Sequence, residues 1–286
     1  MSRKSFSVAF ALCFAVSSVQ AEPAMWVIKD SDSTIYLIGT LHLLKHDAEW
    51  KSEKVKKTVG ESTELWLEIA DDENQAALQP LLAKHGMDPD KPLSKKLNQV
   101  QRKKLEKIAA TYGLPVANLE PLQPWLAAVV LGTIPLVKAG YDPKSGVDRM
   151  LRAQAVAEGD QIRGLETAEA QVRMMAGLPQ AVQIAFLVET LEDMEEGLEL
   201  LEKIAKAWMD GDTETIARLG VAEMKREAPA AYKMLLVDRN VAWSEQIVEM
   251  LKGSGVVQIA VGAGHLAGPD SVQAQLEKKG IKVERY

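Results

Sequence analysis

The chain contains very little cysteine, and this scarcity excludes several kinds of chemistry. Its only cysteine among 286 residues is Cys13, which lies in an apolar N-terminal segment that we expect to be removed. The remaining chain then carries no thiol, so it can hold neither a catalytic cysteine nor a disulfide framework. A chain without cysteine is compatible with an oxidising compartment such as the periplasm.

Several short catalytic and nucleotide-binding motifs are missing as well. The sequence has no Gly-x-Ser-x-Gly nucleophile elbow and no His-Glu-x-x-His zinc helix. It also lacks the Gly-x-x-x-x-Gly-Lys phosphate loop and the Gly-x-Gly-x-x-Gly dinucleotide motif. These absences disfavour a serine hydrolase of the α/β-hydrolase type, a nucleoside triphosphatase and a nucleotide-dependent dehydrogenase.

Basic clusters and long apolar runs are also scarce. The formal net charge is −6, and nucleic acid is a disfavoured partner because binding to phosphates needs a concentrated Lys/Arg surface. The apolar run Trp125–Val137 is interrupted by Gly132 and Pro135. It is shorter than the roughly 20 residues that span a bilayer, which favours a buried core helix.

The N-terminus has the pattern of a secretory signal peptide. Arg3 and Lys4 precede the apolar run Phe6–Val16, and small residues lead up to Ala21. We predict cleavage after Ala21, which leaves one domain over residues 22–286 and no membrane anchor. A start-anchor helix is the alternative, but the run is short for a bilayer span. The expected location is therefore periplasmic or secreted.

Two apolar runs of strand type end in the same short motif. Thr34–Ile38 is followed by Gly39-Thr40-Leu41-His42, and Val256–Val261 is followed by Gly262-Ala263-Gly264-His265. We expect each glycine to let the chain turn off the sheet and approach another group closely. The two histidines would then lie at the carboxyl ends of the strands, where open α/β sheets bind ligands.

Further strand patterns surround these two and predict the fold class. Met25–Asp30 is expected to form a hairpin with the first run, and Glu64–Ala70 and Gln161–Glu166 are expected to be strands. A last strand is expected over Ile281–Val283, whereas residues 74–252 are mostly helical in pattern. The predicted fold is α/β (α+β), with a central sheet built from N- and C-terminal βα segments and a large helical insertion that covers the sheet edge.

One helix in this insertion carries a heptad-like stripe. A long helix is predicted to begin near Pro179 and to present apolar side chains at alternating steps of four and three. The stripe consists of Leu187, Leu191, Met194, Leu198, Leu201, Ala205 and Trp208. Such a stripe fits a helix hairpin within the chain or a dimer seam, so a dimer is possible.

The two histidines and one carboxylate have the composition of a metal site. Glu68 emerges from an apolar strand and is the obvious third member beside His42 and His265. Two imidazoles and a carboxylate suit a first-row divalent metal with open positions. A metal held in this way can lower the pKa of a bound water and supply hydroxide to a polarised carbonyl.

Seven short motifs follow one another along the mature chain. They are Ile38-Gly39-Thr40-Leu41-His42, Glu64–Glu68, Pro124-Trp125, Gly146-Val147-Asp148, Gly164-Leu165-Glu166-Thr167, Arg239-Asn240 and Val261-Gly262-Ala263-Gly264-His265. Together and in this order they resemble the TraB/GumN family, whose animal relatives are the TIKI membrane metalloproteases. The resemblance covers nearly the whole mature chain.

The resemblance implies a protease-like site that depends on a divalent metal, namely manganese, cobalt or zinc. It assigns His42 and His265 as metal ligands and Glu68 as a ligand or general base. Four further residues are expected to bind substrate or to orient those groups: Asp148, Glu166, Arg239 and Asn240. The two acids could orient the histidines. Arg239 could pair with an acid or hold a substrate carboxylate. His46 and His85 lie in charged loop contexts and are expected to be solvent-exposed, although His46 could reach the same metal.

Two functions follow as expectations. The first is a secreted or periplasmic metal-dependent hydrolase, most simply a peptidase with a peptide or protein substrate. The second is a non-catalytic envelope protein that binds haem or a peptide in the same cleft, since ChaN-like relatives bind haem. A catalytic role needs an acid or base beside the site, whereas haem binding does not need Glu68.

Overall fold

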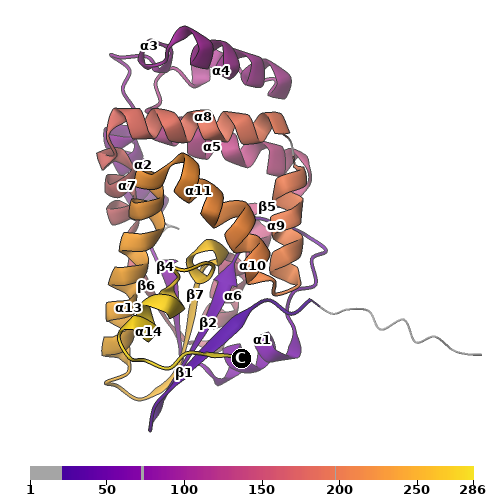
Figure 1. Ribbon diagram of the computed structural model, residues 1–286, viewed down its shortest axis with the longest axis vertical. Helices are drawn as coiled ribbons and strands as arrows, with labels where there is room; N and C mark the ends of the chain where they lie inside the picture. Colours follow the sequence, from indigo (N-terminus) through magenta and orange to yellow (C-terminus); the bar gives the residue numbers. More distant parts are fainter. Residues whose placement is uncertain (1–20, 72–73, 197) are drawn as a thin grey trace, which may run out of the picture.

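The computed structural model describes residues 21–71, 74–196 and 198–286. The predicted signal peptide, with Cys13, lies outside the described residues except for Ala21. The described chain is elongated: a twisted sheet lies at one end, and layers of helices are stacked beyond its strand ends (Figure 1). This arrangement confirms the predicted α/β class.

The central sheet has six strands in the order β6-β4-β7-β2-β1-β8. They are β1 (Met25–Lys29), β2 (Ser33–Thr40), β4 (Glu64–Ile69), β6 (Gln161–Glu166), β7 (Gly255–Gly262) and β8 (Glu284–Arg285). The strands β6, β4, β7 and β2 run parallel, whereas β1 is antiparallel to both β2 and β8. Segments from both ends of the chain therefore build one sheet, as the sequence predicts. The last strand is β8, which begins just after the predicted Ile281–Val283.

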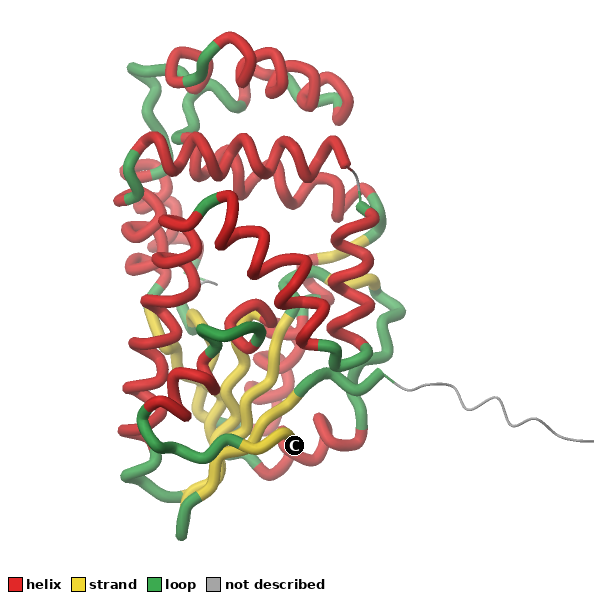
Figure 2. Tube along the Cα trace, in the orientation of Figure 1, coloured by secondary structure: helices red, strands yellow, loops and turns green. Residues whose placement is uncertain are grey.

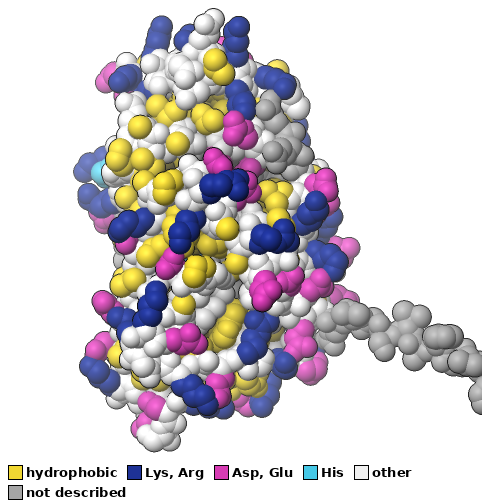
Figure 3. All heavy atoms as spheres, viewed as in Figure 1, with side chains coloured by type: hydrophobic (Ala, Val, Ile, Leu, Met, Phe, Trp, Pro, Cys, Tyr) yellow, Lys and Arg dark blue, Asp and Glu magenta, His cyan; other side chains and the backbone are white. Residues whose placement is uncertain are grey.

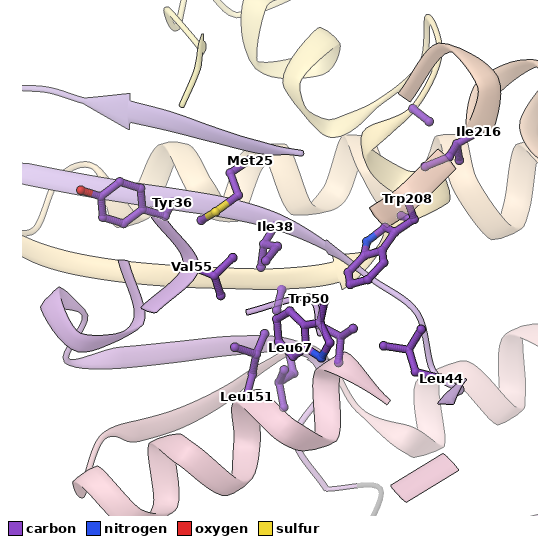
Figure 4. Packing of buried hydrophobic residues seen from close by; sticks show 14 of the residues in the cluster. Met25, Tyr36, Ile38, Leu44, Trp50, Val55, Leu67, Leu151, Trp208 and Ile216 are labelled. Atoms are coloured by element: carbon purple, nitrogen blue, oxygen red, sulfur yellow. The ribbon is translucent and has the colours of Figure 1, made fainter. Parts of the chain in front are cut away.

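Helices cover both faces of this sheet because each strand alternates apolar side chains between them. On one face Tyr36 and Ile38 pack in a cluster that includes residues of α1 (Glu53–Glu61) and α6 (Val147–Glu158). On the other face Ile35 and Leu37 pack in a cluster with residues of α13 (Asp238–Met250) and α14 (Val272–Lys278). Figure 4 shows the first of these clusters, in which the rings of Trp50 and Trp208 have their centroids 5.9 Å apart.

The remaining helices form a cover at the carboxyl ends of the parallel strands (Figure 2). They are α2 (Gln75–His85), α3 (Leu93–Lys96), α4 (Gln99–Tyr112), α5 (Pro124–Lys138), α7 (Ala168–Gly177), α8 (Gln180–Glu196), α9 (Glu199–Met209), α10 (Thr213–Ile216), α11 (Ala222–Glu227) and α12 (Pro229–Tyr232). Local signals set several of their ends. For example, the capping box of Asn98 and Gln101 begins α4, and Gly113 with φ of 69° ends it. Two short strands, β3 (Leu44–Lys45) and β5 (Tyr141–Asp142), pair beside the cover.

The prediction of a single long helix after Pro179 is wrong. Two helices, α8 and α9, replace it, because the stripe serves two different cores. Leu187, Leu191 and Met194 pack with α4 and α5, whereas Trp208 packs against the sheet. These four side chains are therefore buried by other parts of the same chain. A dimer stays a prediction.

No single helix within the described ranges is long and apolar enough to cross a membrane. Among the described helices, one pair, Ala168–Gly177 and Gln180–Met194, has the length and apolar composition of a membrane span when the two are taken together, but they are bent by 101°. The apolar helix α5 buries one face, with Ala127, Ala128 and Leu131, and exposes Val129 and Val130 on another.

Candidate functional site

The two Gly-x-x-His motifs lie side by side where β2 and β7 end. In the parallel register Gly39 pairs with Val261 and Thr40 with Gly262, so the strands β2 and β7 end at the same level of the sheet. Adjacent parallel strands bring their carboxyl ends together whatever lies between them in sequence. His42 follows β2 directly, and His265 lies in η5 (Ala263–Leu266), a short 3₁₀ turn after β7.

The motif glycines are required for close approach and not for an unusual backbone angle. Neither Gly39 nor Gly262 has positive φ, so the turn off the sheet, which at Gly262 leads into the 3₁₀ turn Ala263–Leu266, needs no left-handed backbone. A Cβ on Gly39 would lie 3.1 Å from the Cα of Ala263, and one on Gly262 would lie 3.0 Å from Oε1 of Glu68. The Gly262 N–H donates to that same oxygen at 2.7 Å. The glycines therefore let the two motifs and Glu68 pack together.

His42 lies in the cleft with a carboxylate behind it. Its Nδ1 is 3.3 Å from Oδ1 of Asp148, at the start of α6, and its side chain is 62% exposed. The hydrogen bond to Asp148 raises the pKa of His42 to about 9 against the opposing effect of burial. The contact with Asp148 fixes one ring nitrogen and directs the other, Nε2, away from it. The sequence-based expectation that Asp148 orients a histidine therefore agrees with the geometry.

His265 is buried and held at both ring nitrogens. Burial lowers its pKa to about 4, although the charge of Glu68 opposes this effect, so the ring is neutral at pH 7. Its Nε2 is 3.0 Å from Nη1 of Arg239, and its Nδ1 is 2.6 Å from Oδ1 of Asn240. Arginine can only donate, so Nε2 is the acceptor and Nδ1 carries the proton that is donated to Asn240. The ring of Trp243 lies against it, with centroids 4.4 Å apart.

Arg239 is the central cation of the cluster. Its Nη2 donates to Oε2 of Glu68 at 2.6 Å and also to Oε1 of Glu166, at the end of β6. The guanidinium lies over the ring of Trp243, 4.5 Å from its centroid. Arg239 lies two residues after the end of a π-helical segment, η4 (Lys233–Val237), and such segments are frequent at functional sites. Of the two roles expected for Arg239, the structure shows the acid pairing.

Glu68 is a buried, ionised acceptor. Burial alone would raise its pKa, but His265 when protonated, and Arg239 at any pH, lower it to about 2. Both carboxylate oxygens have donors: Oε1 accepts from Gly262, and Oε2 accepts from Arg239 and from Nε2 of Gln171 at 3.3 Å. With so low a pKa and no free oxygen, Glu68 suits fixing Arg239 better than removing a proton from water.

The three predicted ligands do not fit a metal site as their side chains are placed. In the part of the chain that the structure describes, no group of three His, Cys, Asp or Glu side chains could hold a metal ion. The reason is Arg239, which contacts Nε2 of His265 and Oε2 of Glu68, two of the atoms that would bind the metal. Metal binding stays a prediction.

The other predicted residues divide into those in the cluster and those outside it. Glu166 contacts Arg239 and not a histidine, which differs from its expected orienting role. His46 lies outside the cleft, where its Nε2 is 3.0 Å from Oδ2 of Asp142 and its side chain is 77% exposed. His85 is half-buried and not, as expected, solvent-exposed, and its Nε2 lies in the interior of the protein.

Two members of the cluster are missed by the sequence reasoning. Gln171 bridges Glu68 and Glu166, and Trp243 packs on both Arg239 and His265. In the sequence, these two residues are marked only by their spacing from other site residues and helix ends. Trp243 lies four residues after Arg239 on the same helix face, and Gln171 lies one turn into the helix that Thr167 caps.

The family model for the TraB/PrgY/gumN family matches residues 24–285 of this chain. The chain belongs to the TraB/PrgY/gumN family. The match confirms the resemblance inferred from the seven motifs, and it spans all elements that build the site.

Three relatives align with this chain over most of their own length. The uncharacterized protein YbaP of Escherichia coli (strain K12) is 24% identical over 254 residues, covering 89% of this chain and 92% of YbaP. YbaP of Shigella flexneri gives the same identity and coverage. An uncharacterized protein of Treponema pallidum (strain Nichols) is 20% identical over 273 residues, covering 91% and 82%. No solved structure matches this TraB/PrgY/gumN chain.

Proposed function

We propose that this protein is a hydrolase of the periplasm or the secreted fraction that cleaves peptide bonds, with His42 as its proton-transfer group. The observation that carries the proposal is the His42–Asp148 pair, 3.3 Å between Nδ1 and Oδ1, at the mouth of a cleft. A histidine tied to a carboxylate at one nitrogen and open to the cleft at the other is a common general base. The export step follows from the basic, apolar and small-residue pattern of residues 1–21.

The reaction balances without a further reactant. Neutral His42 takes one proton from water at Nε2 while the water oxygen bonds to the carbonyl carbon. The imidazolium, stabilised by Asp148, then gives that proton to the amide nitrogen as the C–N bond breaks. The products are a carboxylic acid and an amine, and one water is consumed. Arg239, Glu68 and the neutral His265 line the same cleft as His42 and, joined by hydrogen bonds of Arg239, form its buried floor.

Digestion of a defined mixture of short synthetic peptides, followed by mass spectrometry, tests the proposal. Wild type is expected to generate new termini, and His42→Gln is not. If wild type leaves every peptide intact, the hydrolase proposal is wrong. A Soret band on addition of haemin to that inactive protein would then favour the second prediction, non-catalytic haem binding.

Changing Asp148 to asparagine is expected to shift the pH dependence of hydrolysis. The active form of His42 is the deprotonated one, so kcat/KM of wild type should rise with pH up to about 9, the raised pKa of His42. Asp148→Asn keeps an acceptor oxygen but removes the negative charge that stabilises the imidazolium, so the rise should be complete at a lower pH, toward the ordinary value of 6.5. The measurement is kcat/KM from pH 5 to pH 10.

The matched control is Asp142→Asn, which removes the negative charge beside His46, outside the cleft. This variant should keep the wild-type profile. Identical midpoints for wild type and Asp148→Asn would show that Asp148 does not control the catalytic group.

A further inference from the structure

The cleft has two arms that meet at His42, Glu68 and Gln171. One arm has a volume of ≈ 120 Å³ and the other of ≈ 360 Å³, and these three residues line both. A ligand whose reacting bond lies beside His42 therefore extends into one arm on each side of that bond. The chemistry of each arm indicates which part of the ligand it receives.

The larger arm is mostly apolar and lies beneath the helical cover. Beyond the charged cluster its walls come from α5, α7, α11 and η4. The lining side chains are Trp125, Val129, Val172, Met174, Met175, Met224, Leu235 and Leu236. Methionines fill irregular shapes, so three of them let the arm accept apolar groups of different form. Hydrophobic side chains also gather on the outer surface over the cover helices (Figure 3).

The smaller arm carries charged side chains of both signs, Glu68 and Asp148 beside Arg149 and Arg152, together with apolar lining from Leu67, Ile69 and Ala260. It lies between the ends of β2 and β4 and the first turns of α6, which contributes Asp148, Arg149 and Arg152. Asp148 is engaged with His42. Both arginines also make other polar interactions, but a guanidinium has five N–H donors and can bind a carboxylate in addition. The small volume of this arm leaves room for one small residue.

We propose that the site removes a small C-terminal residue from an apolar peptide, a proposal that rests on the hydrolase function above. The apolar chain lies in the large arm, the last peptide bond lies beside His42, and the terminal carboxylate lies near Arg149 and Arg152. The two acids of this arm are already paired, Glu68 with Arg239 and Asp148 with His42. Arg149 and Arg152 therefore favour a carboxylate over the ammonium group at the N-terminal end of a peptide, and the difference in volume places the small residue on their side. Water adds to the carbonyl carbon of the last peptide bond, which releases one amino acid.

Three peptides test this specificity: Ac-Leu-Leu-Gly, its C-terminal amide, and Ac-Gly-Gly-Gly. Loss of the apolar side chains should lower kcat/KM at least about 10-fold, since one pocket group alters it by about 10- to 200-fold. Loss of the carboxylate should lower kcat/KM about 10- to 100-fold, because hydrogen bonds to charged groups are strong. Arg152→Gln should remove most of the difference between acid and amide.

A matched pair of variants locates the apolar arm. Val129 and Val130 are neighbours on α5 with similar exposure, 44% and 41%, but only Val129 of the two lines this arm. Val129→Trp should fill the arm and lower kcat/KM for Ac-Leu-Leu-Gly about 10-fold or more, with little change for Ac-Gly-Gly-Gly. Val130→Trp should leave both values unchanged.

The readouts separate failure of this inference from failure of the hydrolase proposal. Binding of Ac-Leu-Leu-Gly to His42→Gln, followed by calorimetry, does not depend on turnover. If Val129→Trp weakens this binding, and amidation of the peptide weakens it as well, the two-arm site is supported even if wild type hydrolyses nothing. Hydrolysis at internal bonds, or equal kcat/KM for the three peptides, overturns the inference and leaves the hydrolase proposal standing.

Discussion

Replacing His42 by glutamine is expected to lower kcat/KM for peptide hydrolysis by about 10²- to 10⁴-fold, the range for a general acid–base group. Glutamine keeps a polar side chain of similar length but cannot take a proton from water. Because His42 is 62% exposed and projects into the cleft, the change should leave the unfolding temperature close to that of wild type. Steady-state kinetics on both proteins gives the ratio directly.

His46→Gln is the control for this substitution. His46 lies four residues after His42 and also contacts a carboxylate, that of Asp142, but it does not line the cleft. Its loss should leave kcat/KM unchanged. Equal activity of wild type and His42→Gln would remove His42 from the mechanism.

Replacing Arg239 by methionine is expected to destabilise the protein by about 3–5 kcal/mol. Methionine roughly fills the space of the arginine stem but leaves Glu68 and Glu166 buried without their cation, and loss of one partner of a buried pair costs about this much. Unfolding in urea, with midpoint and slope fitted, measures the loss in the free energy of unfolding. The variant protein should also lose hydrolytic activity, because the floor of the site is disturbed.

Arg163→Met is the matched surface control for Arg239→Met. Arg163 also pairs with a glutamate, Glu64, and lies over a tryptophan, Trp66, but its side chain is 49% exposed. Surface pairs contribute only about 0–1 kcal/mol, so this variant should remain within that range of wild type. If Arg239→Met is as stable as Arg163→Met, the buried cluster does not hold the site together.

The strands and the paired histidines could be predicted because their signals are local. Apolar runs such as Thr34–Ile38 bury both faces of a parallel strand, and the repeated Gly-x-x-His marks two strand ends. Sheet order could not be read in the same way: β7 enters between β2 and β4, and no local pattern specifies a neighbour that is distant in sequence. The break between α8 and α9 was missed for a similar reason, since heptad spacing does not say which core each side chain joins.

The composition of the site could be predicted better than its arrangement. All seven predicted residues, His42 through His265, lie in or beside one cluster, but the sequence could not place the guanidinium of Arg239 among them. Its position follows from the long α13 and the π-helical segment before it, which aim the side chain at Glu68 and Glu166. As the side chains are placed, the guanidinium contacts His265 and Glu68, two of the three predicted metal ligands, and their role as ligands stays a prediction.

Hydrolysis by metal-free protein tests the central claim most directly. The protein is treated with a chelator, its metal content is checked by elemental analysis, and cleavage of Ac-Leu-Leu-Gly and of the peptide mixture is followed with and without added manganese, cobalt or zinc. The His42–Asp148 account predicts the same His42-dependent rate in the metal-free protein as in the metal-supplemented one. Activity that disappears with the chelator and returns only with a metal would contradict it.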